Sequence, residues 1–495
     1  MRAIPAALLH EVDALFRARV EAGTAPSSAW GVFDADGLVA SGGHGDRGDG
    51  RAPDADTVYR IASCTKSVTA AALLILVERG LVDLDAPITE FVPAFAAVPM
   101  PIPDAPVPTL RMLLTMAGGF PTDDPWADRQ EAISDDDLDA VLRAGVLFDS
   151  VPGTRFAYSN LGYALLGRTI ARVSGRSYQD FATEEVLAPV GLPSTSFRAP
   201  SHAGFVVRGA RSHDDAWEYL PMSGPGAFSS IGGLFSTVSD LSRWARHLSA
   251  AFRPPGPAVD AIGSAGTGQG GGTAPLSGPV TAANRRLMQQ AMRMVPARAP
   301  RRPMGYGFGL FVEHDDRVGT IASHSGGYPG FSAHMRWSVE TGVGVVAFEN
   351  ATAARVPRAA EQAHDLLLTR LPVPAATDRL LPETRAAQRA VSRLLAEWRD
   401  DLADAVFAPN VALDVPYDRR RAALATAVAA TGADLHAAPE HEESDGPAHL
   451  VWRIPGEHDM LRVEIRLAPL SVGLVQTLVV RAATRAAAAP SEPRR

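Results

Sequence analysis

The first part of the chain carries a helical and then an extended pattern of apolar residues. Five apolar positions fall on one face at helical spacing, namely Leu8, Val12, Leu15, Phe16 and Val20. Gly23 stands where a C-terminal cap would end this helix. The next stretch, SAWGVFDADGLVASGG, has Asp36-Gly37 between two short apolar runs. The pattern therefore predicts a helix followed by a β-hairpin.

A second region is apolar without alternation. After TVYRIAS the chain reads CTKSVTAAALLILVERG and has no proline before Pro87, which predicts a core helix beginning at or near Ser63. Further on, Ser134 is followed three residues later by Asp137, a capping-type start for another helix. A third helix is indicated by apolar residues on one face, Leu161, Leu165, Leu166, Ile170 and Val173.

Residues 253–279 are rich in glycine and proline and have no apolar period. This composition predicts a mobile loop. The alternative is a phosphate-binding loop at GTGQGGG. That alternative is disfavoured because no strand precedes the segment and no Gly-Lys-Ser/Thr opens a helix after it.

The last third of the chain returns to strands and then changes character. Glu340-Thr341-Gly342 marks a turn between two strand-like runs, and a helix is predicted at 355–370. The segment LPVPAATDRLLPE reads as a linker. Beyond it we expect a helix at 383–400 and a half-buried strand, in which Leu461, Val463, Ile465 and Leu467 alternate with charged residues. We therefore expect two domains, residues 1–372 and a small α+β domain at 373–495.

Composition narrows the class of protein. A chain of 495 residues with 46% hydrophobic and 21% charged residues is typical of a soluble globular protein of two domains. The formal charge of -8 argues against a nucleic-acid partner, and the short run at 419–421 does not change that. The N-terminus has charges throughout and no secretory pattern, and no window approaches the ~18 uncharged residues of a membrane span. We expect a cytoplasmic protein without a membrane partner.

The basic residues are distributed in an unusual way. The chain has 47 of them, and all except Lys66 are arginines. Lys66 lies three residues after Ser63 at the predicted helix start, so the two side chains share one face. A buried lysine can lose its proton and act as a base, whereas arginine stays protonated. The pair is a candidate nucleophile and base, although Ser-x-x-Lys also arises by chance.

Two further clusters carry candidate chemistry. Tyr158-Ser159-Asn160 precedes the third predicted helix and offers a phenol for proton transfer beside a substrate-binding amide. The alternative is a capping asparagine beside a core tyrosine. His324-Ser325-Gly326-Gly327 lies in a strand-like context, where small residues would let a substrate backbone pair with the strand. The alternative there is a bulge with a surface histidine.

In their order along the chain, Ser-x-x-Lys, Tyr-x-Asn and His-x-Gly resemble the three motifs of the serine β-lactamase and penicillin-binding-protein-like hydrolases, in particular the class C-like branch. The resemblance covers about residues 5–372. It implies an α/β (α+β) fold of the β-lactamase/transpeptidase type, with an antiparallel sheet flanked by helices and a helical subdomain at about 84–225. The small C-terminal domain is appended to it.

The resemblance also implies roles for single residues. Ser63 would be acylated, Lys66 and Tyr158 would share the acid and base work, and the backbone N–H groups of Ser63 and Gly327 would form the oxyanion hole. Substrate binding would fall to Asn160, His324, Ser325 and Gly326. No metal and no cofactor are implied. His324 stands where many lactamases have lysine, which weakens a dedicated β-lactamase interpretation.

Two other features have a structural interpretation. Cys64 is adjacent to the expected nucleophile, but it lies about 100° around the helix and should point into the core. A lone cysteine also excludes an internal disulfide. The residues His436, Glu440, His441, Glu442, Glu443 and Asp445 are grouped like metal ligands. Because they show neither helical nor strand spacing, we expect a solvated acidic loop.

The sequence thus predicts a serine hydrolase that forms an acyl-serine intermediate, with a small-molecule ester or amide as its partner. The absence of an export pattern favours a carboxylesterase acting on small esters. The alternatives are a D-amino-acid peptidase or amidase, a β-lactamase-type hydrolase, and a non-catalytic scaffold with this fold. The oligomeric state is left open.

Overall fold

The computed structural model describes residues 4–199, 204–214, 216–252, 278–296, 302–372 and 376–484. The chain forms two compact units, Met1–Val373 and Pro374–Arg495. Most of the loop predicted at 253–279 lies outside the described residues.

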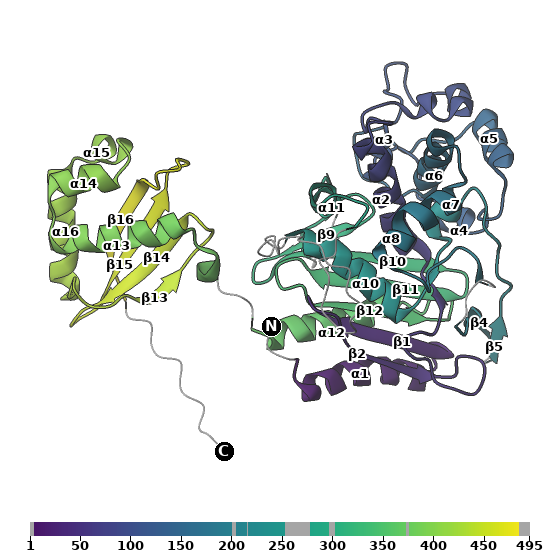
Figure 1. The fold of residues 1–495 in the computed structure, drawn as a ribbon, viewed down its shortest axis with the longest axis horizontal. Helices are drawn as coiled ribbons and strands as arrows, with labels where there is room; N and C mark the ends of the chain where they lie inside the picture. The colour runs from purple at the N-terminus through teal and green to yellow at the C-terminus, as the bar shows by residue number, and fades with distance from the viewer. Residues whose placement is uncertain are drawn as a thin grey trace, which may run out of the picture. The chain divides into compact units, whose positions relative to one another are not determined.

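The first unit is built on an eight-stranded antiparallel sheet with the strand order β2-β1-β12-β11-β10-β9-β8-β7 (Figure 1). Its strands are β1 (Ser27–Phe33), β2 (Leu38–Gly45), β7 (Arg293–Met294), β8 (Met304–Tyr306), β9 (Phe311–Asp315), β10 (Gly319–Tyr328), β11 (Phe331–Ser338) and β12 (Gly344–Glu349). Two small antiparallel pairs accompany it, β3 (Tyr59–Arg60) with β6 (Phe235–Ser236) and β4 (Ala210–His213) with β5 (Ala216–Tyr219).

The described helices of this unit are α1 (Ala6–Glu21), α2 (Thr65–Glu78), α3 (Leu110–Leu114), α4 (Asp124–Ala127), α5 (Asp135–Ala144), α6 (Asn160–Ser174), α7 (Tyr178–Ala182), α8 (Ala188–Val190), α9 (Ser229–Gly232), α10 (Val238–Ser249), α11 (Ala282–Met288) and α12 (Pro357–Arg370). Of these, α1 and α12 pack on one face of the main sheet and α10 packs on the other. The prediction of an antiparallel sheet flanked by helices is confirmed.

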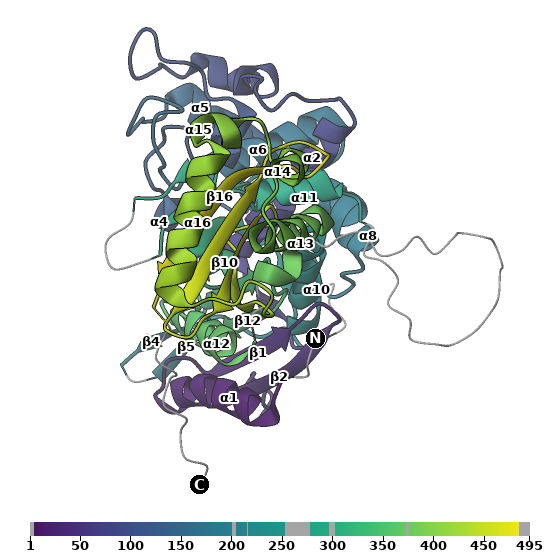
Figure 2. The same cartoon turned by 90° about the vertical axis from the view of Figure 1, so that its left-hand side faces the viewer.

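The main sheet has an apolar layer on each face, and side-chain alternation along β1 explains why there are two. Trp30 and Val32 face α1 and α12, and the ring of Phe16 in α1 stacks on Trp30 with centroids 5.8 Å apart. Ala29 and Phe33 point to the opposite face, into the core that contains α2 and α10. Figure 2 shows α1 running alongside β1 and β2 at one side of the sheet. A period of two in the strand therefore produces two separate apolar layers.

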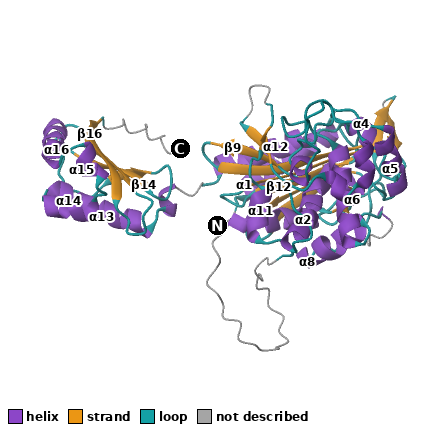
Figure 3. Ribbon diagram, turned by 90° about the horizontal axis from the view of Figure 1, so that it is seen from above, coloured by secondary structure: helices purple, strands orange, loops and turns teal. Residues whose placement is uncertain are grey.

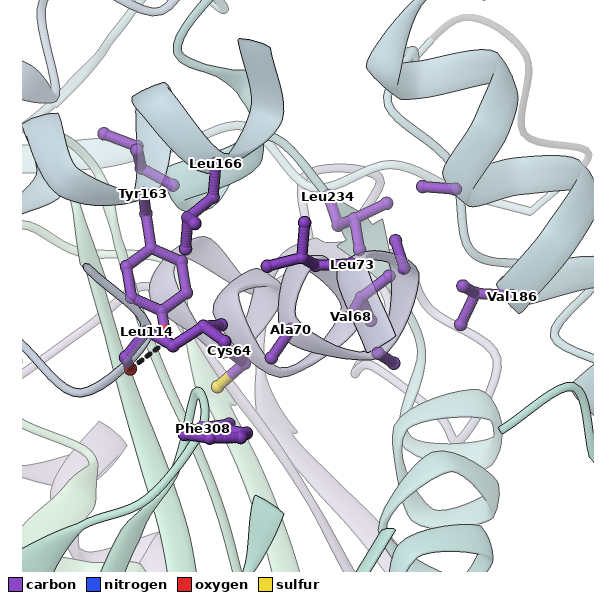
Figure 4. Close-up of a cluster of buried hydrophobic side chains, with 14 of the residues drawn as sticks. Cys64, Val68, Ala70, Leu73, Leu114, Tyr163, Leu166, Val186, Leu234 and Phe308 are labelled. Carbon is purple, nitrogen blue, oxygen red and sulfur yellow. Dashed lines mark hydrogen bonds between the residues drawn. The ribbon is translucent and has the colours of Figure 1, made fainter. Parts of the chain in front are cut away.

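The predicted core helix is α2, preceded by a 3-10 turn at Ala62–Cys64. Its residues from Thr65 to Leu76 are all buried, which agrees with the absence of a polar stripe in the sequence. Figure 4 shows the side chain of Cys64 in the apolar cluster near Phe308, with Val68 and Leu73 further along the same helix. The thiol therefore lies in the core, as predicted.

Several local predictions are confirmed. The hairpin β1–β2 turns at Asp36-Gly37, and α1 ends before Gly23, which has a left-handed φ of 70°. Ser134 and Asp137 form a reciprocal capping box at the start of α5. These signals are local, because each depends on hydrogen bonds between residues two to four positions apart.

The second unit consists of four helices and a four-stranded antiparallel sheet with the order β13-β14-β15-β16. The elements are α13 (Pro382–Ala396), α14 (Asp400–Val406), α15 (Asn410–Asp414), α16 (Tyr417–Thr431), β13 (Glu440–Glu443), β14 (His449–Pro455), β15 (Met460–Leu467) and β16 (Val475–Ala483). Helices α13, α15 and α16 pack against the sheet, and α14 packs against α13 (Figure 3). The alternation predicted for β15 is confirmed, with Leu461, Val463, Ile465 and Leu467 buried.

Two predictions in this unit need correction. The helix expected at 383–400 ends at Ala396, and α14 begins separately at Asp400. The acidic segment expected to be a loop contains the edge strand β13. Its four residues are all polar or charged, and a bulge at His441, whose φ is 50°, interrupts the pairing, so the strand is not visible in the sequence. Charged side chains are common on such an edge because they oppose pairing with another chain.

Helices of the part described here are either too short or too polar to span a bilayer.

Candidate active site

Ser63 lies in the tight turn that connects β3 to α2. It is 8% exposed, and the residue before it, Ala62, has a left-handed φ of 46°. A non-glycine residue in this region is strained, and surrounding structure must hold it there. One such contact comes from β10, because a Cβ at Gly326 would lie 2.2 Å from the Ile61 carbonyl oxygen. Glycine at 326 therefore allows β10 to approach the turn that presents Ser63.

Lys66 lies one helical turn after Ser63 and is fully buried. Its Nζ atom lies 2.9 Å from Ser63 Oγ, 2.6 Å from Asn160 Oδ1 and 2.8 Å from the Ile231 carbonyl oxygen. An ammonium has three hydrogens, so these partners satisfy all of them. The neutral amine has two hydrogens and one lone pair. Because the amide and backbone oxygens can only accept, the lone pair is then left facing the Ser63 hydroxyl.

Burial also favours the neutral form of the Lys66 amine. It lowers the pKa of Lys66 to about 8, although the nearby carboxylates of Asp124, Asp128 and Asp123 act in the opposite direction. A lysine with this pKa exchanges its proton close to neutral pH. The arrangement therefore supplies a base next to a serine hydroxyl.

Tyr158 and Asn160 reach the same point from the start of α6. Ser159 caps this helix, and its hydroxyl accepts from the Gly162 N–H group at 3.3 Å. Met116 supports the segment from behind, because its carbonyl oxygen accepts from the Ala157 N–H group at 2.8 Å. The cap fixes where the helix begins, and this places the Asn160 amide against Lys66.

The Tyr158 phenol completes the cluster around Ser63. The Ser63 side chain lies near enough to the phenol to act on its pKa, and the Tyr158 ring centroid is 5.1 Å from Lys66 Nζ. The same ring stacks on Phe311 with centroids 6.3 Å apart. Burial raises the pKa of the phenol well above its usual value. The phenol thus stays protonated in the pH range where Lys66 exchanges its proton.

The third motif lies on β10. Pairing between β10 and β9 ends at Ser323, whereas pairing with β11 continues to Tyr328. Gly327 has no atom within 4 Å of an added Cβ, so space is open beside it. The edge of β10 next to the nucleophile turn therefore has room for a substrate.

The side chains of His324 and Ser325 are engaged elsewhere. His324 is 1% exposed, its Nδ1 atom is 2.7 Å from the Ser325 carbonyl oxygen, and its Nε2 atom is 3.1 Å from the Tyr306 hydroxyl. Burial lowers the pKa of His324 to about 3. The ring is therefore neutral, with its proton on Nδ1. The Ser325 hydroxyl lies 3.0 Å from His334 Nδ1, its cross-strand neighbour on β11.

Three predicted residues, Ser63, Lys66 and Tyr158, meet within one cluster, and Asn160 joins them. Sequence reasoning missed Ile231, whose backbone oxygen carries no sequence signal, and Asp124, whose carboxylate lies 2.6 Å from Asn160 Nδ2. Both come from segments distant in sequence.

A buried ion pair behind the cluster was also missed. Arg60 pairs with Glu131, and its guanidinium carbon lies 3.7 Å from the ring centroid of Tyr328. The same glutamate accepts from the Tyr328 hydroxyl at 3.0 Å and from Ser223 at 2.7 Å. Arg60 closely precedes the nucleophile turn, and Tyr328 immediately follows Gly327. The pair therefore ties the turn to the end of β10.

The other two candidate features have structural partners. The Cys64 thiol donates to the His324 carbonyl oxygen, and burial raises its pKa to about 12. Glu442 bonds Arg385, and Glu443 bonds Arg453. Within the ranges that the structure covers, no group of histidine, cysteine and carboxylate side chains is arranged to hold a metal ion.

Comparison with known proteins gives a consistent picture. The model of the beta-lactamase family, described as Beta-lactamase, matches residues 12–369. D-alanyl-D-alanine-carboxypeptidase/endopeptidase AmpH of Escherichia coli strain K12 is 28% identical over 212 residues, which are 40% of this chain and 51% of the relative. Penicillin-binding protein 4 of Amycolatopsis lactamdurans is 31% identical over 256 residues, 48% of this chain and 64% of the relative. The chain thus spans between 51% and 64% of the length of these curated relatives.

Solved structures share the fold. The octameric penicillin-binding protein homologue from Pyrococcus abyssi has a TM-score of 0.60 at 20% identity, covering 94% of this chain and 92% of its own. EstCE1, a hydrolase with promiscuous acyltransferase activity, has a TM-score of 0.57 at 18% identity, covering 73% and 98%. A mutant class C beta-lactamase has a TM-score of 0.58 at 15% identity, covering 74% and 97%. At these identities the likeness concerns the fold alone.

Proposed function

This chain belongs to the beta-lactamase family, a family of serine hydrolases, and from that premise we propose that it is a carboxylesterase acting on small esters through an acyl-Ser63 intermediate. The observation that carries the proposal is the contact of 2.9 Å between Ser63 Oγ and the buried Lys66 Nζ. A serine hydroxyl needs a base to become a nucleophile, and a lysine with a pKa of about 8 is one. An intact cluster of this kind argues against a non-catalytic scaffold.

The acylation step follows from the positions of the groups. Ser63 Oγ attacks the ester carbonyl carbon while its proton moves to the lone pair of neutral Lys66. The carbonyl oxygen becomes an oxyanion, which the backbone N–H groups of Ser63 and Gly327 stabilise. One such donor is worth about 3–4 kcal/mol of barrier. When the tetrahedral intermediate collapses, the ester C–O bond breaks and the acyl group stays on Ser63.

Tyr158 would deliver the proton that the leaving group needs. The phenol lies near Ser63, and Lys66 Nζ lies over its ring, so the proton taken by Lys66 would pass through Tyr158 to the departing alkoxide. The raised pKa of the phenol supports this role, because a protonated phenol can donate. In deacylation the same groups activate a water molecule, which attacks the acyl carbon and releases the carboxylic acid and free Ser63.

Substrate binding would rely on amide and backbone groups. An asparagine amide has two N–H donors, and Asn160 uses one of them toward Asp124. The other remains for the substrate. His324 and Ser325 would act through their backbone, and Gly326 through the close approach that it allows. The buried, neutral His324 offers no cation for a substrate carboxylate, which favours an ester over a β-lactam.

A second candidate is an amidase acting on D-amino-acid derivatives. The carboxylates of Asp124 and Asp128 lie close enough to Lys66 to raise its pKa, and they would attract a substrate with a free amino group. A D-stereospecific amidohydrolase from Streptomyces sp. shares the fold, with a TM-score of 0.56 at 22% identity, covering 72% of this chain and 98% of its own.

A panel of p-nitrophenyl esters, D-amino-acid p-nitroanilides and nitrocefin tests these alternatives. We expect the highest kcat/KM on a short-chain ester, and loss of that turnover in Ser63→Ala. A preference for a D-amino-acid anilide would transfer the proposal to the second candidate. Turnover of nitrocefin above all esters would contradict both.

We further propose that residues 373–495 are a separately folding domain that shapes substrate access or assembly and takes no part in the chemistry. It has its own apolar core in the four-stranded sheet and its helices. A protein ending at residue 372 should stay soluble and still react with a fluorophosphonate at Ser63. Complete loss of soluble protein would mean that the C-terminal residues complete the core of the first domain.

A further inference from the structure

We propose that Asp124 is a positioning residue that fixes the Asn160 side-chain amide with its oxygen toward Lys66 and thereby reserves the Lys66 lone pair for Ser63. The inference rests on the proposed function, because it assigns Lys66 as the base. Asp124 itself touches neither Lys66 nor Ser63 through a hydrogen bond among the contacts of the described residues. It acts through Asn160.

The contacts form a continuous chain. Asn160 Nδ2 donates to Asp124 Oδ1 at 2.6 Å, and Lys66 Nζ donates to Asn160 Oδ1 at 2.6 Å. Lys66 Nζ also lies 2.9 Å from Ser63 Oγ. Asn160 is fully buried, so water does not compete for its amide. The carboxylate and the nucleophile are therefore connected by three hydrogen bonds in series.

The orientation of the amide decides what Lys66 can do. A carboxylate only accepts hydrogen bonds, so it binds the NH2 end of Asn160 and directs the oxygen toward Lys66. If the amide turned over, its NH2 group would face the lysine. The neutral amine would then accept a hydrogen bond from Asn160, and its lone pair would no longer be free for the Ser63 proton. An unsuitable amide orientation would thus occupy the base without removing it.

The segment that carries Asp124 is itself held in place. The preceding residue, Asp123, accepts from the Asn160 and Leu161 N–H groups at 2.7 and 2.8 Å. The ring of Trp126 packs edge-on against Phe228, with centroids 5.6 Å apart. Asp123 therefore fixes α4 to the backbone at the start of α6, and Asp124 binds the adjacent side chain. One carboxylate thus holds the backbone of α6, and its neighbour holds the Asn160 side chain.

Asp124 also contributes a charge, which must be separated from its hydrogen bond. Its carboxylate raises the pKa of Lys66, as do those of Asp128 and Asp123. Around the amine lie further titratable groups, the Cys64 thiol, the phenols of Tyr158 and Tyr163, and the His324 ring. Burial raises the pKa of Asp128 to about 7, so its carboxylate carries a charge in the upper part of the pH range. There Asp128 provides the matched control, because it acts on Lys66 through charge and has no hydrogen bond to Asn160 among the contacts of the described residues.

Three variants separate the two effects. Asp124→Asn keeps an oxygen that accepts from Asn160 but loses the charge, Asp124→Ala loses both, and Asp128→Asn loses a charge alone. The readout is the rate at which a fluorophosphonate labels Ser63 as a function of pH, with kcat and KM on the best ester and the thermal midpoint of each variant. The labelling rate does not depend on the substrate class.

We expect Asp124→Ala to lose about 10–100-fold in labelling rate and in kcat, with a smaller change in KM. The labelling rate of Asp124→Asn at its optimal pH should stay within about 3-fold of the wild-type rate. The rise of this rate with pH should move to lower pH, because a negative neighbour of Lys66 is gone. Asp128→Asn should shift the rise in the same direction and reach the same maximal rate as the wild type. Since Asp124 is exposed, the thermal midpoints should change little.

The inference is overturned if Asp124→Ala is labelled at the wild-type rate, or if all three variants lose the same amount, since charge alone would then account for the effect. If Asp124→Ala is too unstable to assay, the isosteric Asp124→Asn decides: a much lower maximal labelling rate would overturn the inference, and a retained maximal rate would support it. If wild-type Ser63 is not labelled at all, the proposed function itself is wrong.

Discussion

Two buried bases flank the Tyr158 phenol, and they differ in what surrounds them. Lys66 is enclosed by oxygen acceptors and has three carboxylates nearby, and its pKa is about 8. His324 is enclosed by the rings of Tyr306, Phe311 and Tyr158, and its pKa is about 3. Burial disfavours the charged form of both. Only on the lysine side do nearby charges act against it.

The difference assigns the two residues to different tasks. Lys66 changes its protonation near neutral pH, so it can accept and return a proton in each cycle. His324 stays neutral at every pH well above its pKa of about 3 and keeps both ring nitrogens bonded, so it supports the aromatic wall behind Tyr158. A buried residue therefore titrates near neutral pH only where nearby carboxylates limit the effect of desolvation.

The largest effect should follow from replacing Lys66. Lys66→Arg retains the positive charge but cannot lose the proton, and Lys66→Ala has no base at all. We expect both to lose at least ~100-fold in turnover on the best ester. The thermal midpoint serves as the control, and it should stay within a few degrees of the wild type. Near-normal turnover in Lys66→Arg would contradict the assignment, because a permanently protonated group would then suffice.

A smaller loss is expected at Tyr158. Tyr158→Phe keeps the ring stacked on Phe311 and removes the hydroxyl near Ser63, which should reduce kcat by ~10–100-fold. Tyr163→Phe is the matched control. That ring also lies near Lys66, with its centroid 5.7 Å from Nζ, but its hydroxyl bonds the Leu114 carbonyl oxygen. Equal losses in the two variants would mean that the Tyr158 hydroxyl has no special part in proton transfer.

The smallest loss is expected at His324. Glutamine offers a donor and an acceptor in place of the two ring nitrogens, so His324→Gln should lose less than ~10-fold through altered packing. Because His324 does not titrate in the working range, the acid limb of kcat/KM should keep its position. Loss of that limb in the variant would transfer the role of base from Lys66 to His324.

The parts of the molecule that the sequence predicts are those set by short-range signals. The capping box at Ser134 and the alternation in β15 depend on neighbouring residues and are visible in the sequence. The lone lysine pointed to the residue that contacts Ser63 Oγ, because a composition without other lysines made it conspicuous. The edge strand β13 was not visible in the sequence, because its four residues are all polar or charged, none of them is buried, and a bulge at His441 interrupts the pairing.

The parts that could not be predicted are contacts between distant segments. Asp124 and the Ile231 carbonyl reach Asn160 and Lys66 from positions 36 and 165 residues away. The sequence has no period or motif for such contacts, because they depend on how α4 and α9 pack around α2. For the same reason the sequence does not show that the ring of His324 on β10 is bonded to Tyr306 and to a backbone carbonyl.

The central claim is that neutral Lys66 activates Ser63, and one measurement tests it most directly. The rate at which a neutral fluorophosphonate labels Ser63 is followed from about pH 5 to about pH 10, and the adduct is mapped by peptide mass. Protonated Lys66 cannot accept the serine proton, so the rate should be low in acid and rise to a plateau with a midpoint near the lysine pKa of about 8. The adduct should lie on Ser63. A rate independent of pH, or an adduct on another serine, would contradict the account.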